Sequence, residues 1–103
     1  VAAWQALDEL RLTYLAKTAE FDAVILPTAP ITPPNIQRLL TDGTYYLSEN
    51  LMALRNTRIA NLIGLCALTL PTGIPSCGVS LMGHPLQEER LLRLGLAAET
   101  ALS

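Results

Sequence analysis

The segment NLIGLCALTLPTG, residues 61–73, carries the clearest structural signals in this chain. Gly64 ends a helical pattern, since glycine adopts the left-handed conformation of a helix C-terminus at little cost. The apolar run at 67–70 then predicts a β-strand, and the cluster PTGIP at 71–75 predicts a turn. Residues 78–82 predict another strand, which we expect to pair with the first as an antiparallel hairpin.

Helical patterns lie on both sides of this hairpin. Upstream, leucines and Arg58 share one face of the stretch from about 45 to 63, which predicts one long helix that ends at Gly64. Downstream, residues 86–101 predict a last helix. Its Glu88-Glu89 pair is expected in the first turn, where the helix dipole favours negative charge.

The N-terminal third predicts a helix, a strand and a loop. Residues 2 to about 20 have apolar side chains at helical spacing, and we expect this helix to pack on a sheet. The run AVIL at 23–26 is apolar on both faces, which is typical of a strand buried in a covered sheet. Four prolines within residues 27–34 exclude a helix or a central strand, so an extended loop is expected there. The order of elements predicts an α/β fold.

The composition limits the classes of protein to which the chain can belong. Half of its 103 residues are hydrophobic and 16% are charged, against about 25% charged in an average soluble domain. This composition excludes disorder, and it predicts that the apolar surface drives self-association or contact with a larger body. Seven scattered basic residues and a net charge of −2 argue against a nucleic-acid partner. No apolar run approaches the roughly 20 residues of a membrane span, so we expect no membrane partner and a cytoplasmic location.

Cys66 and Cys77 lie in the predicted hairpin, and His84 follows it. Cys66 should face a residue near Met82, which leaves Cys77 about five residues along the ladder, too far for a disulfide. A Cys77-His84 nucleophilic pair can be drawn, but Cys77 lacks the helix N-terminus or strained turn that activates a thiol. Two distant cysteines and one histidine offer no metal site, and no glycine-rich phosphate loop is present, so neither a metal nor a cofactor is expected.

Arg55, Arg58 and Asn61 are the candidate substrate-binding residues. Steps of three residues keep them along one side of the predicted helix. Two guanidinium groups and an amide suit a carboxylate or another polar end of a substrate. A stripe that faces solvent, or that pairs with acids of another domain, explains the same residues without a ligand.

Four short motifs, taken in order, resemble the C-terminal portion of the amidase signature family. They are FDAVILPTAP at 21–30, NLIGLCALTLPTG at 61–73, GVSLMG at 78–83 and EERLL at 88–92. The corresponding family patterns are FDxLxxPTxP, NLxGxPAxxxPxG, PxGxQxxG and DxxLLxxAxxxE. The likeness covers nearly the whole chain, and it implies that residues 1–103 form the C-terminal segment of an amidase domain.

The resemblance implies a mixed sheet covered by helices and the hydrolysis of carboxamide C–N bonds. The family's Ser nucleophile, its second Ser in a cis peptide and its Lys base are expected upstream, in sequence that this chain does not contain. Lys17 is therefore not the base, and no catalytic residue is expected among these 103 residues. The chain alone should be inactive, and it would supply sheet core and one wall of the cleft for a small amide substrate.

One departure from the family bears on the substrate. Glutamine-using members carry an acid seven positions before the asparagine of the NLxG motif, and this chain has Leu54 there. Leu54 beside Arg55 and Arg58 would suit a different amide, one that bears an anionic group. Two other hypotheses stay open: a non-catalytic α/β module for oligomerisation or docking, and a small hydrolase that uses Cys77.

Overall fold

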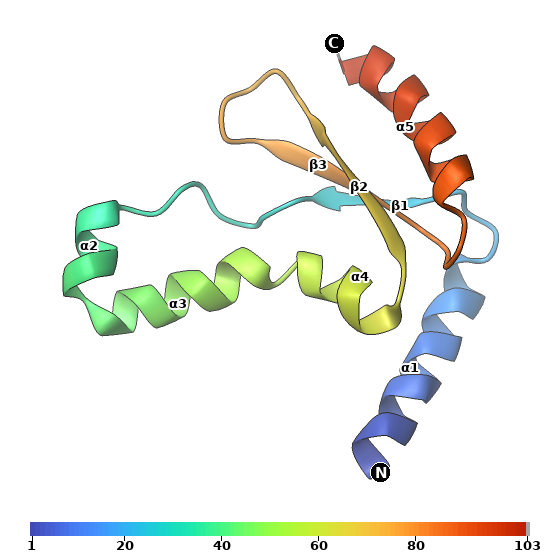
Figure 1. The fold of residues 1–103 in the computed structure, drawn as a ribbon, viewed down its shortest axis with the longest axis horizontal. Helices are drawn as coiled ribbons and strands as arrows, with labels where there is room; N and C mark the ends of the chain where they lie inside the picture. The colour runs from blue at the N-terminus through green and yellow to red at the C-terminus, as the bar shows by residue number, and fades with distance from the viewer. Residues whose placement is uncertain (103) are drawn as a thin grey trace.

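A small sheet lies between helices in a flat, open arrangement, in the computed structural model that describes residues 1–102 (Figure 1). The elements in order are α1 (Ala2–Thr18), β1 (Val24–Pro27), α2 (Ile36–Thr41), α3 (Gly43–Leu54), α4 (Thr57–Ile63), β2 (Cys66–Pro71), β3 (Gly78–Gly83) and α5 (Glu88–Leu102). The radius of gyration is 16.1 Å, against about 13 Å for a compact domain of about 100 residues. The described chain is therefore less compact than an independent domain of this length. No described helix has the length and apolar character needed to cross a membrane.

The strands form one antiparallel sheet in the order β1-β3-β2. β2 and β3 form the predicted hairpin, in which Thr69 faces Ser80 and Cys66 faces Gly83. β1 pairs with the other side of β3, where Leu26 faces Ser80. β3 is thus the central strand, and within residues 1–102 the outer edges of β1 and β2 have no strand beside them.

One face of the sheet packs against α5. Leu91 of this helix joins Leu70 and Leu81 of the strands in a buried cluster. At Gly95 the helix lies so close to β2 that an added Cβ would collide with the side chain of Leu68. These contacts confirm the predicted hairpin and last helix, and they place the core between the β2–β3 hairpin and α5.

The predicted single helix over residues 45–63 is wrong, because the chain forms two helices, α3 and α4. The break falls at Arg55 and Asn56. The hydroxyl of Thr57 donates to the carbonyl of Leu54 at 3.3 Å, which satisfies one acceptor at the end of α3. A threonine side chain can compete with helical hydrogen bonds in this way, and the hydrophobic pattern contains no information about that competition.

Two side-chain caps create a corner that the sequence pattern does not predict. Asn35 begins α2 by accepting from the amide of Arg38 at 3.0 Å. Asp42 begins α3 by accepting from the amide of Tyr45 at 3.1 Å. Such caps satisfy the free amides of a first helical turn. The guanidinium of Arg38 lies 4.0 Å from the centre of the Tyr45 ring, which holds α2 against α3.

Two expectations about the N-terminal third are wrong. α1 has no buried residue, and its main contacts are with α4 rather than the sheet, including a 3.0 Å bond from Arg11 Nε to the carbonyl of Leu62. β1 is not covered on both faces, because the side chain of Ile25 is 68% exposed. In both elements, apolar side chains face space that no described residue fills.

Tyr14 carries a buried hydroxyl without a hydrogen-bond partner in the described part of the chain, and burial raises the pKa of this phenol above 10.0. We expect Tyr14→Phe in the intact protein to change the free energy of unfolding by less than about 1 kcal/mol at neutral pH, because no hydrogen bond is lost. Above about pH 10 the variant should be the more stable. The unfolded wild-type chain ionises its phenol there more readily than the folded chain does, so wild-type stability falls as the pH rises. Denaturant unfolding at both pH values measures this, and a wild-type advantage at high pH would contradict it.

Candidate functional site

α4 places Arg58 and Asn61 beside the end of α3. Leu54, Thr57, Arg58 and Asn61 line a shallow concavity of about 240 Å³. The arginine and the asparagine are three residues apart on α4, so they are neighbours on the helix surface. Their side chains are exposed, and Leu54 adds an apolar wall.

Arg55, the third predicted binding residue, does not line this concavity. It is the residue at the C-terminal cap of α3, whereas Arg58 and Asn61 belong to α4. The break between the helices therefore separates Arg55 from the continuous stripe that one long helix would have formed. The structure groups two of the three predicted residues with Leu54 and Thr57, and it leaves Arg55 at the junction.

The charge of Arg58 is not neutralised by a neighbour. Four of the seven basic residues form ion pairs with carboxylates: Arg11, Arg38, Arg90 and Arg93. Within residues 1–102, Arg58 and Arg55 form no ion pair, and neither does Lys17. An unpaired guanidinium can bind a planar anion by donating two parallel hydrogen bonds to it.

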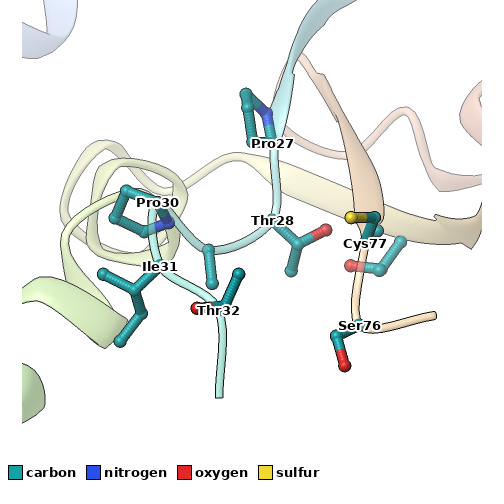
Figure 2. A pocket seen from close by; sticks show the side chains of 10 residues that line it. Pro27, Thr28, Pro30, Ile31, Thr32, Ser76 and Cys77 are labelled. Atoms are coloured by element: carbon teal, nitrogen blue, oxygen red, sulfur yellow. The ribbon is translucent and has the colours of Figure 1, made fainter. Parts of the chain in front are cut away.

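A larger concavity of about 490 Å³ lies where the loop after β1 meets the tip of the β2–β3 hairpin (Figure 2). Figure 2 shows Thr28 between Pro30 and Ile31 on one side and Cys77 on the other. Its lining has no charged side chain: Pro27, Thr28, Ala29, Pro30, Ile31, Thr32, Thr69, Ser76, Cys77 and Gly78. The sequence pattern predicts the proline-rich loop but not this concavity, which forms only because β1 pairs with the distant strand β3.

Between this concavity and α4, three side-chain hydroxyl groups form hydrogen bonds with one another across the sheet. Ser80 on β3 is 8% exposed, and its Oγ lies 2.8 Å from Thr28 Oγ1 and 3.2 Å from Thr69 Oγ1. The two threonine hydroxyls give the buried Ser80 hydroxyl its hydrogen-bond partners, as a buried polar group requires. Ser80 stands where the family pattern has glutamine, and beside it a small cavity of about 70 Å³ extends to Asn56 and Thr57.

The structure separates Cys77 from His84. They flank β3, whose six residues span roughly 20 Å, so the geometry excludes a Cys77-His84 pair. The His84 ring instead shares a 2.9 Å hydrogen bond with Thr18. Cys66 and Cys77 are both free, as predicted. Among the described residues, no group of three His, Cys, Asp or Glu side chains could hold a metal ion.

A family model described as Amidase matches residues 2–92, which is most of the chain. The chain belongs to the amidase family. The match confirms the resemblance that the four motifs indicate, and the mixture of helices with a small sheet is consistent with a piece of the amidase fold. Asn61, which lines the concavity together with Leu54 and Arg58, is the first residue of the second motif.

Relatives within the amidase family differ in what their names say they act on. The chain is 39% identical over 87 residues to 2-amino-5-chloromuconic acid deaminase of Comamonas testosteroni, over 81% of this chain and 19% of the relative. It is 34% identical over 87 residues to a subunit of glutamyl-tRNA(Gln) amidotransferase from Sulfurisphaera tokodaii, over 82% of this chain and 18% of the relative. Identity to the protein of the same name from Desulfatibacillum aliphaticivorans is 38% over 79 residues, with 72% and 15% covered. The chain thus spans less than a fifth of the length of these relatives, and no solved structure matches it significantly.

Proposed function

We propose that this chain supplies the C-terminal part of a cytoplasmic hydrolase that cleaves carboxamide C–N bonds in small molecules bearing an anionic group. The β1-β3-β2 sheet and α5 would provide core for the larger enzyme. Leu54, Thr57, Arg58 and Asn61 would form one wall of its substrate cleft, and Arg55 would add positive charge at the edge. The nucleophile and the base would come from the rest of the protein, as the family resemblance implies.

The unpaired Arg58 beside Leu54 is the observation that carries this proposal. Arg58 and Asn61 offer hydrogen-bond donors in one concavity without an ion pair in the described chain. Leu54 is apolar, whereas the resemblance implies an acid at this position in members that use glutamine. The site therefore favours a substrate carboxylate over the ammonium group of an amino acid. The arginine attracts a carboxylate, and no acidic side chain in the site attracts an ammonium group.

The names of the relatives support C–N cleavage with different substrates. The deaminase is named for 2-amino-5-chloromuconic acid, a dicarboxylic acid, which agrees with an anionic group on the substrate proposed here. The amidotransferase relatives are named for glutamyl-tRNA(Gln). Leu54 argues against glutamine as the amide donor of this chain, and we propose no nucleic-acid partner for it.

The alternative is a non-catalytic module for oligomerisation or docking. Exposed apolar side chains such as Trp4, Phe21 and Ile25 favour it. The same side chains are expected in a segment that a larger enzyme covers. The family match over residues 2–92 favours the enzyme.

Arg58→Ala in the full-length enzyme tests the proposed function. We expect kcat/KM for succinamate, an anionic amide, to fall about 30-fold, since charge-assisted hydrogen bonds contribute roughly 2 kcal/mol. Butyramide, a neutral amide of similar length, should lose less than about threefold. The measurement is the ratio of the two kcat/KM values.

Arg93→Ala is the matched control, because it removes an exposed arginine that pairs with Glu89 on α5, away from the concavity. It should leave the ratio at the wild-type value. An unchanged ratio in Arg58→Ala would contradict the proposed function, and so would a wild-type enzyme that hydrolyses neither amide.

A further inference from the structure

The side chain of Asn56 ties the junction of α3 and α4 to the end of β1. Its Nδ2 donates to the carbonyl of Pro27 at 2.8 Å. Pro27 is the last residue of β1, so this carbonyl lies where the edge strand continues into the proline-rich loop. The bond joins two segments that are 29 residues apart in sequence and fixes the helix junction to the sheet.

Few hydrogen bonds within the junction itself fix the angle between α3 and α4. The amide of Arg55 donates to the carbonyl of Met52, and the amide of Ile59 donates to the carbonyl of Asn56, both at 3.2 Å and both three residues back. Bonds of this spacing have poorer geometry than those of an α-helix. The angle between α3 and α4 therefore depends on an anchor outside the helices, and Asn56 provides one.

This anchor lies between the sheet and the candidate binding surface. Asn56 and Thr57 line the small cavity against the strands, whereas Leu54, Thr57 and Arg58 line the concavity on the outside. Leu54 ends α3, and Arg58 belongs to the first turn of α4. A rotation at Asn56 therefore changes the separation and relative direction of Leu54 and Arg58.

We infer that Asn56 is a positioning residue, whose hydrogen bond to the Pro27 carbonyl orients α4 and thereby aims Arg58 at the anionic end of the substrate. The inference rests on the proposed function of Arg58. Asn56 itself touches no substrate and acts through Arg58. Its loss should therefore affect the binding of an anionic amide more than the chemical step or the binding of a neutral amide.

Asn56→Ala in the full-length enzyme tests this role, because alanine removes the donor without adding charge and favours a continuous helix. We expect KM for succinamate to rise about fivefold with kcat within about twofold, and KM for butyramide to stay within about twofold, since one hydrogen bond of modest net strength is lost. Asn56→Gln keeps an amide donor and should recover part of the lost affinity. Asn50→Ala, the same change on an exposed residue of α3, is the matched control and should leave both KM values unchanged.

A double variant distinguishes positioning from a general structural effect. In the Arg58→Ala background, Asn56→Ala should change the succinamate-to-butyramide ratio no further, since residues that act through one another are not additive. Additive losses, equal rises in both KM values, or wild-type kinetics of Asn56→Ala would overturn the inference. If Asn56→Ala does not fold, as judged by its thermal midpoint, Asn56→Ser is measured by the same criteria. Failure of Arg58→Ala alone to change the ratio overturns the proposed function instead.

Discussion

Leu81→Ala is expected to lower the free energy of unfolding by about 3 kcal/mol, which raises the unfolded-to-folded ratio more than about 100-fold. Leu81 lies on the central strand β3, is 3% exposed, and packs with Leu70 and Leu91 between the sheet and α5. Shortening its side chain leaves a cavity that close-packed neighbours fill only in part. The loss is a large share of the roughly 5–15 kcal/mol that stabilises a typical domain.

Denaturant unfolding of the full-length protein, followed by circular dichroism, measures this change. Arg93→Ala is the control on α5, since the charged Arg93 side chain is 74% exposed. It should change the free energy of unfolding by less than about 0.5 kcal/mol. Equal destabilisation by the two substitutions would contradict the core assigned here.

Local signals were enough to predict the C-terminal half of the fold. Gly64 adopts the left-handed conformation that ends α4, with φ of +82°. The proline-glycine turn separates two strands that pair in an antiparallel hairpin, and Glu88 and Glu89 lie in the first turn of α5. Each of these features depends on residues close together in sequence, which is why the pattern alone predicted them.

The break at Asn56 could not be predicted in the same way. Its side chain bonds to the Pro27 carbonyl, a partner that lies 29 residues away and belongs to a different element. The spacing of leucines continues across the break, so periodicity favours one helix where the tertiary contact favours two. Steps of three residues predicted one stripe of Arg55, Arg58 and Asn61, but only Arg58 and Asn61 lie on α4, whereas Arg55 lies at the junction.

The concavity of Figure 2 was missed for a related reason. Thr28 and Cys77 come together there because β1 pairs with β3, and the partners Leu26 and Ser80 are separated by about half of the chain. A sequence pattern identifies a strand but does not identify its partner. The exposure of Ile25 was also unpredictable, because an apolar strand has the same composition whether its cover comes from this chain or from another part of a larger enzyme.

Part of the uncovered apolar surface lies beside β1. Beside α5, the residues Phe21, Ile25, Leu81, Leu94 and Ala98 contribute to an open groove of about 270 Å³. The outer edge of β1 has no strand beside it in the described structure, so a strand of another chain can pair with it. An apolar groove next to an open strand edge favours association when nothing else covers it.

The 103-residue polypeptide expressed alone is therefore expected to self-associate and to hydrolyse no amide, whereas the full-length enzyme is expected to hydrolyse succinamate. Association follows from the open edge of β1 and the groove beside it, and inactivity follows from the absence of the family's Ser and Lys machinery from these residues. Light scattering over a concentration series measures the first, and ammonia release from succinamate measures the second. A monomer at high concentration would contradict the exposed surface. Turnover by the isolated chain that Lys17→Ala or Cys77→Ala abolishes would contradict the location of the catalytic residues in the rest of the enzyme.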